Sequence, residues 1–327
     1  MTASDILSIL RQRGDSVSGQ ELCQLFGVSR TAVWKRIRQL QEEGYEIEAV
    51  PNRGYRLLSA PDVMTAQEVE GHLHTRWAGH PTYYFPTIGS TNQYAKQIAE
   101  EGAPEGALVI ADEQTAGRGR RGHTWATPPG TAIAMTLVLR PTLPLDRIAM
   151  VTPVIGLAAA DACRELCSDQ VSIKWPNDVV IGGKKISGIL TEMSAEMNAV
   201  HYVVIGIGIN VNVEEFPEEL REIGTSLRIE TGREHNRAQL IAKIMEYFEK
   251  YYACLQETKD LSGLREHYNE LLVNRGREVR VLDPNGEFTG VAEGINDLGE
   301  LLVRREDGEL VNVYAGEVSV RGLYGYV

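Results

Sequence analysis

The spacing of apolar residues changes twice along this chain of 327 residues, and this change constrains the fold more than any other feature. Near the N-terminus, apolar residues recur every three or four positions, which is typical of helices that bury one face. The middle of the chain mixes helical segments with short apolar runs of strand length, and residues after Gly276 alternate between apolar and polar. A single hydrophobic core rarely exceeds about 250 to 300 residues, so the sequence predicts an α+β protein of several domains.

Residues 1–60 are predicted to form a winged helix-turn-helix domain. Ser18 is placed to cap one helix, with Glu21 completing a capping box, and Ser29 is placed to cap the next. Gly27 lies in the turn between them, which gives the spacing of a helix-turn-helix. The segment "YEIEAVPNRGYRLLS" then alternates polar and apolar residues around a turn, as expected for a two-stranded wing.

The second helix of this pair carries the candidate DNA-binding residues. The chain has a formal net charge of -12, but residues 1–60 hold eight Lys and Arg against seven Asp and Glu, compared with 25 against 38 in the remainder. Because its bases gather at the recognition helix, this segment favours DNA binding. The alternative is a three-helix packing module that binds no nucleic acid. Once Val33, Ile37 and Leu40 face inward, the residues left for a DNA groove are Ser29, Arg30, Thr31, Trp34, Lys35 and Arg38.

A domain boundary is predicted at Pro61 and Asp62, with a new helix starting at Thr65. The pattern then predicts a central α/β domain with a mixed sheet over residues 66–273. Its expected strands lie within 107–114, 131–141, 171–193 and 200–213, and its expected helices within 90–102, 151–167 and 237–256. Residues 274–327 contain short alternating runs joined by Asn-Gly and Asp-Gly turns, which predicts a small antiparallel β-barrel.

The segment "EQTAGRGRRGHTW", residues 113–125, places three arginines within four positions between glycines. Two charges about 4 Å apart repel by roughly 4 kcal/mol at an effective dielectric constant near 20, so an anion is expected to neutralise them. If the segment is extended, Arg118 and Arg120 point the same way and suit a phosphate or carboxylate. The alternative is a solvated basic turn.

A second polar cluster lies in "KWPNDVVIGGKKISG". Pro176 fixes its own backbone and favours an extended residue before it, which holds Asn177 and Asp178 at a strand edge. The turn "IGGKK" is expected to project Lys185 back toward the same side, although a charged hairpin tip is the alternative. In addition, "GSTNQ" supplies hydroxyl and amide groups at a helix N-terminus, which suit neutral or anionic groups.

Five motifs, "STNQ", "EQTAGRGRRGHTW", "KWPNDV", "KKISGIL" and "GIGINVN", occur in this order and resemble the biotin protein ligase family. With the N-terminal helix-turn-helix, the whole chain resembles its bifunctional ligase and biotin operon repressor members, whose central domain is of the class II synthetase-like type. The resemblance implies formation of biotinyl-5′-AMP from biotin and ATP, transfer of biotin to a lysine of a biotin carboxyl carrier domain of acetyl-CoA carboxylase or a similar enzyme, and repression of biotin genes. An enzyme without regulation, a biotin sensor without ligation, and a lipoate-type ligase stay open as alternatives.

The resemblance also assigns roles to individual residues. For biotin it implies Ser90, Thr91, Asn92, Gln114, Arg118, Gly119, Arg120, Lys185 and Gly188. For ATP and the adenylate it implies Arg120, Arg121, Trp125, Lys174, Asn177, Asn210 and Arg321. The implied catalytic residues are Arg118, Lys174, Asp178 and Lys185. Mg²⁺ is expected with ATP, held by phosphates rather than by a dedicated protein site.

Two positions depart from the family pattern, and one segment is assigned only by position. Gly89 stands where many members have an acidic residue, and Ala134 stands where an aromatic residue is frequent, so the pocket wall is expected to be roomier. The acidic segment within residues 210–230 is expected to cover the adenylate, with an ordinary surface loop as the alternative.

The remaining expectations concern location and partners. The chain has no run of about 18 apolar residues and no signal-peptide pattern at its N-terminus, which favours a cytoplasmic protein. Its four cysteines form no Cys-x-x-Cys pair and are expected to be reduced. The expected partners are the carrier domain, operator DNA and a second copy of the chain when ligand is bound, with no membrane.

Overall fold

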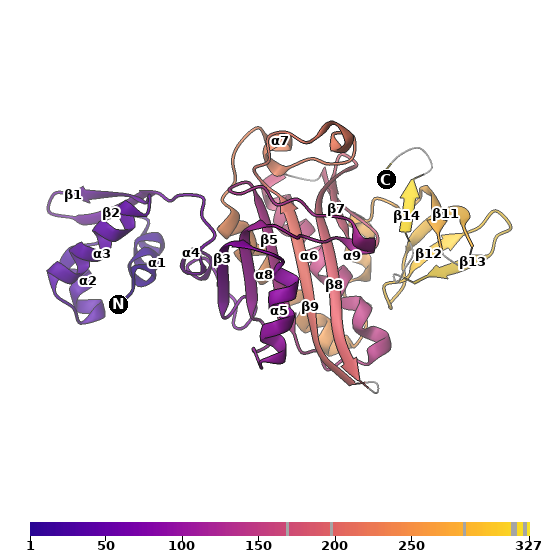
Figure 1. The fold of residues 1–327 in the computed structure, drawn as a ribbon, viewed down its shortest axis with the longest axis horizontal. Helices are drawn as coiled ribbons and strands as arrows, with labels where there is room; N and C mark the ends of the chain where they lie inside the picture. The colour runs from indigo at the N-terminus through magenta and orange to yellow at the C-terminus, as the bar shows by residue number, and fades with distance from the viewer. Residues whose placement is uncertain (168–169, 197–198, 284–285, 315–318, 323–325) are drawn as a thin grey trace.

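A computed structural model describes residues 1–167, 170–196, 199–283, 286–314, 319–322 and 326–327 of the chain. Three parts follow one another in chain order: a small helical part, a large sheet with helices on both faces, and a second, smaller sheet (Figure 1). The first part consists of α1 (Ala3–Arg13), α2 (Gly19–Phe26), α3 (Arg30–Glu42), β1 (Glu46–Val50) and β2 (Gly54–Ser59).

The N-terminal part is the predicted helix-turn-helix with a two-stranded wing. Ser18 and Ser29 accept backbone hydrogen bonds at the starts of α2 and α3, and Gly27 lies between these helices with a φ of 64°. The predicted capping box is only half formed, because the Glu21 carboxylate accepts a hydrogen bond from Arg13 (2.9 Å) instead of closing back on α2. β1 and β2 pair antiparallel to form the wing.

A buried carboxylate connects this part to the central one. Glu68, in α4 (Ala66–Glu70), has no exposed surface. It forms an ion pair with Arg11 of α1 and accepts the hydroxyl hydrogen of Tyr45, and His72 Nε2 lies 3.2 Å from its Oε1. Removing the partners of a buried charge is strongly destabilising. This contact therefore ties α1 and the start of the wing to the linker helix, which Thr65 caps as predicted.

The central sheet has seven strands, of which β3 and β4 are parallel and all other neighbours antiparallel. β3 was not predicted from the sequence. The spatial order is β3 (Thr82–Ile88), β4 (Leu108–Gln114), β5 (Ala132–Leu139), β9 (Ala199–Asn210), β8 (Lys184–Glu196), β7 (Asp178–Ile181) and β6 (Val171–Lys174).

The two faces of this sheet differ in how they are covered. α6 (Val151–Cys167) and α8 (Arg237–Thr258) pack on one face, and α5 (Thr91–Glu100) packs on the other (Figure 1). In β9, Val203 and Ile205 face the core under α6 and α8, whereas Val204 packs with α5. The same alternation turns Gly206 and Gly208 toward the α5 side. Two shorter helices, α7 (Leu227–Thr231) and α9 (Arg265–Leu271), complete the helices of this part.

The C-terminal part is a five-stranded antiparallel sheet. Within the described residues no ladder joins the edge strands β13 and β14, so the expected small barrel is seen as an open sheet. Trp175 attaches this sheet to the central part by donating from its backbone N to Asn274 and from its ring N to Gly299, both at 3.0 Å. The spatial order is β13 (Leu310–Val313), β12 (Leu301–Arg304), β11 (Phe288–Ile295), β10 (Glu278–Leu282) and β14 (Ser319–Gly322).

Two further observations concern the cysteines and the helices of the described residues. All four cysteines are free thiols, and burial raises the pKa of Cys163. Among the helices described, none has the length and apolar character needed to cross a membrane.

Candidate active site and DNA-contact helix

A row of small residues forms the floor of the candidate active site. Strand register aligns Asp178 with Gly188, Gly188 with Gly208, and Gly208 with Ala134 across β7, β8, β9 and β5. A Cβ on Gly208 would lie 2.2 Å from the ring of Trp125, which rests on this floor. The glycines therefore let an aromatic ring, or a ligand in its place, lie against the bare backbone.

Hydroxyl and amide groups gather beside this floor. Gln114 Oε1 accepts from the Thr91 backbone N (2.8 Å) and the Thr91 hydroxyl (3.0 Å). Thr136 Oγ1 lies 2.8 Å from Thr91 Oγ1 and 2.7 Å from Asn92 Oδ1, and Asn92 Nδ2 donates to Glu192 (2.8 Å). Sequence reasoning missed Thr136 and Glu192, although Thr136 is the one polar residue of the apolar strand β5.

The start of α5 reaches this group because β9 carries a glycine beneath it. A Cβ on Gly206 would lie 2.2 Å from Asn92 Oδ1. Ser90 precedes α5, is buried, and makes no capping hydrogen bond with its side chain. The α5 N-terminus thus brings three buried polar residues to the floor, as the "GSTNQ" pattern predicted for residues 90–92.

Positive side chains surround Asp178 on the other side of the floor. Strand pairing sets Lys174 opposite Asp178, and Lys185 Nζ lies 2.6 Å from Asp178 Oδ1. Burial lowers the pKa of Lys174 to about 8, Asp178 opposes this shift, and the positive charges of Arg321, Lys185 and Arg120 add to it. We call Lys174, Lys185, Arg120 and Arg321 the cation cluster. Such a cluster favours anions.

The segment of residues 113–125, which we call the arginine loop, folds back on itself. Trp125 N donates to Gly117 O (3.0 Å), and Arg120–Gly122 form a short 3-10 turn in which Arg121 has a φ of 56°. The segment is therefore not extended throughout, although Gly119, between Arg118 and Arg120, has an extended backbone. Whether Arg118 and Arg120 share one orientation toward an anion stays a prediction. Arg118 and Arg121 are exposed, whereas Arg120 is half-buried and donates to Asn177 Oδ1 (2.9 Å).

The segment predicted to cover the adenylate contacts two predicted site residues. The Lys185 backbone N donates to Ile223 O (2.7 Å), and Thr225 N donates to Lys185 O (2.9 Å). Asn210, at the end of β9, donates from its side chain to Thr225 O (3.2 Å). These contacts join residues 223–225 to the edge of the site.

The cavity between these groups is small, about 50 Å³, whereas small-molecule sites commonly have roughly 300 to 1,000 Å³. Trp125 lies over the floor and takes up most of the space above Gly208. Lys174, Asp178, Arg121, Asn210 and Arg321 lie outside its lining. The predicted residues that line it are Ser90, Thr91, Asn92, Gln114, Arg118, Gly119, Arg120, Trp125, Asn177, Lys185 and Gly188.

The two departures from the family pattern lie at and beside this floor. A Cβ on Gly89 would have no neighbour within 4 Å, so nothing steric requires glycine there. Ala134 ends the row of small residues. Because Trp125 occupies the space, a roomier pocket wall stays a prediction.

The α3 helix presents the predicted DNA-contact residues to solvent. Val33, Ile37 and Leu40 are buried against α1 and α2, as predicted. Trp34 is 50% exposed, and the Arg38 guanidinium carbon lies 5.3 Å from the centroid of its ring. The exposed set is Ser29, Arg30, Thr31, Trp34, Lys35 and Arg38.

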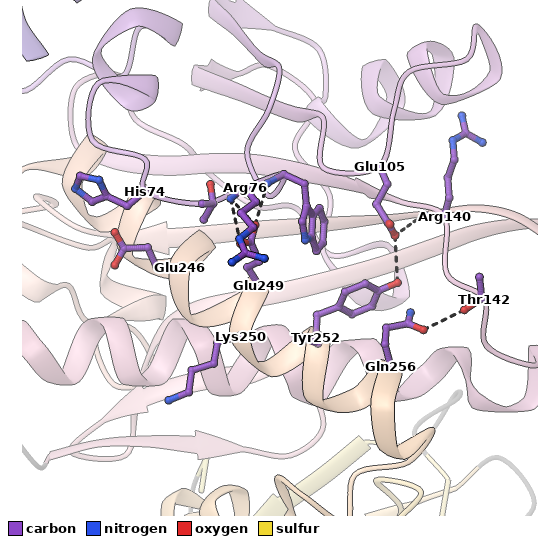
Figure 2. A pocket seen from close by; sticks show the side chains of 13 residues that line it. His74, Arg76, Glu105, Arg140, Thr142, Glu246, Glu249, Lys250, Tyr252 and Gln256 are labelled. Carbon is purple, nitrogen blue, oxygen red and sulfur yellow. Dashed lines mark hydrogen bonds between the residues drawn. The ribbon is translucent and has the colours of Figure 1, made fainter.

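A much larger groove, about 820 Å³, runs beside α8, and its polar groups bond with one another (Figure 2). The Glu249 carboxylate accepts from the backbone N atoms of Arg76, Trp77 and Ala78 at 3.0 to 3.1 Å. Glu105 Oε1 accepts the Tyr252 hydroxyl (3.2 Å) and the Arg140 backbone N (3.1 Å), and Thr142 donates to Gln256 (3.0 Å). None of the predicted site residues lines this groove.

Comparison with known proteins assigns a family to each part of the chain. Residues 84–210 match the biotin/lipoate A/B protein ligase family, residues 2–56 match an HTH domain, and residues 276–321 match the biotin protein ligase C terminal domain. The bifunctional ligase/repressor BirA of Bacillus subtilis is 40% identical over 97% of this chain and 98% of its own length. BirA of Escherichia coli is 31% identical over 96% of each chain.

A solved structure shows the same fold for the ligase part. The biotin protein ligase from Aquifex aeolicus in complex with biotin and ATP aligns with a TM-score of 0.65 and 29% identity, covering 74% of this chain and 98% of that chain. The BirA relatives extend over the N-terminal HTH part as well. The chain therefore belongs to the bifunctional ligase/repressor family of biotin protein ligases.

Proposed function

We propose that this chain joins biotin to ATP to form biotinyl-5′-AMP, transfers biotin to a lysine of a biotin carboxyl carrier domain, and represses biotin genes when ligand is bound. One observation carries the ligase proposal. The small cavity of about 50 Å³, which we call the closed cavity, is lined by Arg118, Arg120 and Lys185 but by no carboxylate among the residues described. Such a site favours two anions that would otherwise repel each other.

The first step needs positive charge and alignment rather than a base. An oxygen of the biotin carboxylate attacks the α-phosphorus of ATP, and the bond from phosphorus to the pyrophosphate oxygen breaks. We assign Arg118 and Lys185 to the biotin carboxylate and Lys174 to the α-phosphate. Arg120 and Arg121 would close over the adenylate. Mg²⁺ would enter with ATP on its phosphates, because no group of three acidic, His or Cys side chains gathers in the described part of the chain.

The polar group beside the glycine floor suits an uncharged head group. Thr91, Asn92 and Gln114 are already oriented by one another and by Thr136. A ureido ring has both N–H donors and a carbonyl acceptor, so hydroxyl and amide side chains can satisfy it. We therefore assign this group, with Ser90, to the biotin ring. Gly188 and Gly119 would permit close approach of the backbone.

The adenine side lies where the arginine loop and the 211–226 segment meet the sheet. Trp125 would turn from its place on Gly208 and pack against the base, because a ligand of this size cannot fit beneath it. Asn177 and Asn210 supply amide groups on the same side, and Arg321 reaches from the C-terminal sheet. These roles stay proposals for the ligand-bound state.

The substrate is biotin rather than lipoate, because the C-terminal match is to a biotin protein ligase domain and both full-length relatives are BirA proteins. The test incubates the full chain with ATP, a carrier domain, and either labelled biotin or labelled lipoate. We expect label from biotin alone on one carrier lysine. Label from lipoate, or tight biotin binding without transfer, would replace this proposal with the lipoate-ligase or the sensor alternative.

We further propose that α3 reads operator DNA from a ligand-bound homodimer. A lone winged helix contacts one half-site, and the overall charge of -12 opposes DNA binding, so a second copy is needed for tight binding. Adenylate that orders the arginine loop and the 211–226 segment would favour the dimer. Carrier, ATP and operator would meet in the cytoplasm. The functional division that follows is 1–60, 66–273 and 274–327.

Gel-shift titration on a palindromic operator tests the repressor proposal. We expect biotin plus ATP to tighten binding by roughly 5- to 150-fold, the usual range of allosteric coupling. Binding should weaken steeply with salt, because Arg30, Lys35 and Arg38 would neutralise phosphates in both half-sites. Equal affinity with and without ligand would eliminate ligand-coupled repression and leave the ligase proposal standing.

A further inference from the structure

The end of the chain lies against the cation cluster. Tyr326 donates its hydroxyl hydrogen to Asp178 Oδ2. Lys174 Nζ lies 3.6 Å from the centroid of the Tyr326 ring, and the Arg321 guanidinium carbon lies 5.4 Å from it. One side chain thus contacts the carboxylate and two of the cations, although it belongs to none of the sequence motifs described above.

Two glycines provide the space in which the last residue packs. A Cβ on Gly322, at the end of β14, would lie 2.1 Å from the carbonyl oxygen of Val327. A Cβ on Gly183, in the turn between β7 and β8, would lie 3.0 Å from Val327 Cγ2. The last residue is therefore fitted between the C-terminal sheet and the turn that precedes Lys185.

Tyr326 completes the set of contacts that orient the Asp178 carboxylate. Lys185 lies 2.6 Å from one carboxylate oxygen, and the Tyr326 hydroxyl donates to the other. Two partners on opposite oxygens restrict rotation of the carboxylate, and each oxygen keeps a second lone pair for an incoming donor. The ring face of Tyr326 also attracts the Lys174 ammonium group, whose pKa burial lowers to about 8.

The hydroxyl remains a donor at neutral and alkaline pH. Burial raises the pKa of Tyr326 above its ordinary value, and the charge of Asp178 raises it further. Tyr326 therefore stays protonated throughout the range in which Lys174 titrates. The titratable and charged groups that face Asp178 are Lys174 from β6, Lys185 from β8, Arg120 from the arginine loop, Tyr268 from α9 and Tyr326.

We propose that Tyr326 is a positioning residue for the transfer of biotin to the carrier lysine, an inference that rests on the function proposed above. In that step the lysine amine attacks the carbonyl carbon of biotinyl-5′-AMP. A C–N bond forms, the bond from that carbon to the phosphate oxygen breaks, and AMP leaves with the electron pair. The proton released by the nitrogen passes to Asp178 and then to solvent, and Tyr326 holds Asp178 in the orientation that receives it.

Tyr326→Phe tests this role, because it keeps the ring over Lys174 and removes only the hydroxyl. Full-length protein is given preformed biotinyl-5′-AMP and a carrier domain. Single-turnover transfer is followed from about pH 6 to about pH 9, a range that spans the lowered pKa of Lys174, about 8. We expect transfer to slow roughly tenfold, the size of one hydrogen bond to a charged group. Biotin-dependent pyrophosphate exchange should change less. The alkaline limb near pH 8, where Lys174 loses its charge, should stay in place, because the Phe ring still lies over Lys174.

Two further variants separate positioning from general damage. Tyr247→Phe removes a hydroxyl that donates to Glu165 (2.7 Å) between α8 and α6, and it should leave transfer unchanged. Truncation after residue 325 removes the hydroxyl together with the Tyr326 ring and Val327. It should slow transfer at least as much as Tyr326→Phe, with the melting temperature as the check on folding.

The outcomes are distinct. A parental transfer rate in Tyr326→Phe would overturn the proposal. A lower KM for ATP and faster exchange after truncation would overturn it too, since the tail would then be an obstruction. Absence of adenylate formation in the parent protein would instead reject the proposed function.

Discussion

The small cavity over β8 and β9 and the open groove beside α8 differ in size and in charge. The groove is much larger, but the cavity has the greater excess of positive charge in its lining. The groove is about 820 Å³ and the closed cavity about 50 Å³. The groove lining holds three Arg and Lys residues and three Glu residues, whereas the closed cavity is lined by three Arg and Lys residues and, among the residues described, no acidic one.

This comparison teaches that the sign of the lining charge, rather than the volume, distinguishes the candidate functional site from the groove. The groove satisfies its own polar groups, as Glu249 does by accepting three backbone N–H groups. The charged residues described in the lining of the closed cavity are all cations, and Asp178, which pairs with Lys185, lies outside that lining. The small size reflects the position of Trp125 over the floor, whereas the charge comes from Lys185 in β8 and from Arg118 and Arg120 in the arginine loop.

The largest expected difference between the two regions comes from removing one lysine from each. Lys185→Ala should reduce biotin-dependent pyrophosphate exchange by roughly a hundredfold to a thousandfold, as for loss of one charge-stabilising donor. Lys250→Ala, in the groove, should leave exchange unchanged. Lys185 is half-buried and paired with Asp178 rather than freely exposed, so thermal unfolding must accompany the assay. Equal exchange in both variants would break the comparison.

A second pair tests retention of the intermediate. Arg120→Gly should still form adenylate but release it roughly tenfold to a hundredfold faster, because one charge-assisted contact is lost. Released adenylate would biotinylate lysines of a bystander protein, and label on that protein is the measurement. Arg76→Gly in the groove is the matched control. If the Arg120 variant kept its intermediate as well as the parent does, Arg120 would not act as a lid.

The pH dependence sharpens the comparison further. The pKa of Lys174 is lowered from 10.5 to about 8 by burial, so in the free protein this side chain loses its charge above pH 8. We expect kcat/KM for ATP to fall about tenfold per pH unit beyond that point, and Lys174→Arg, which stays charged, should lack this limb.

The same shift predicts a sign for stability. Between pH 8 and 10.5 the unfolded chain holds more protons at Lys174 than the folded one, so the contribution of this group to stability rises with pH in that window. Lys174→Met should remove that rise in denaturant titrations. A rise of the same size in the variant would assign the effect to another group.

The smallest effect is expected in the groove. Tyr252→Phe removes a hydroxyl that donates to Glu105 (3.2 Å) and should lower the free energy of unfolding by about 1 kcal/mol. Ligase activity should stay at the parental level in the same preparation. A loss of activity without a loss of stability would give the groove a part in the reaction.

Much of the fold was predictable because each element carries its own pattern. The spacing of Val33, Ile37 and Leu40 identified α3, and short apolar runs identified β4, β5 and β9. β3 escaped prediction because its sequence, "TYYFPTI", lacks clear alternation and contains a proline. The contact between Glu68 and Arg11 could not be predicted, since it joins residues 57 positions apart across a linker.

The site was predictable in its residue types but not in its geometry. Most of the predicted ligand-binding and catalytic residues line one cavity, yet the reason for Gly208 becomes visible only from the register that sets it between Gly188 and Ala134. Thr136 was missed because its contact with Thr91 depends on which face of β5 meets α5. Tyr326 was missed because its contact with Asp178 depends on how residues after β14 pack against β7. Such contacts are set by tertiary packing, which a single sequence does not encode locally.

Hydrogen exchange with and without a non-hydrolysable analogue of biotinyl-5′-AMP tests the central claim most directly. The claim is that the small, cation-lined cavity binds the adenylate while the large groove does not. We predict slower exchange in residues 114–125 and 211–226, which close the cavity, and unchanged exchange in residues 246–256 of α8. Protection along 246–256 without protection of the two loops would contradict the account.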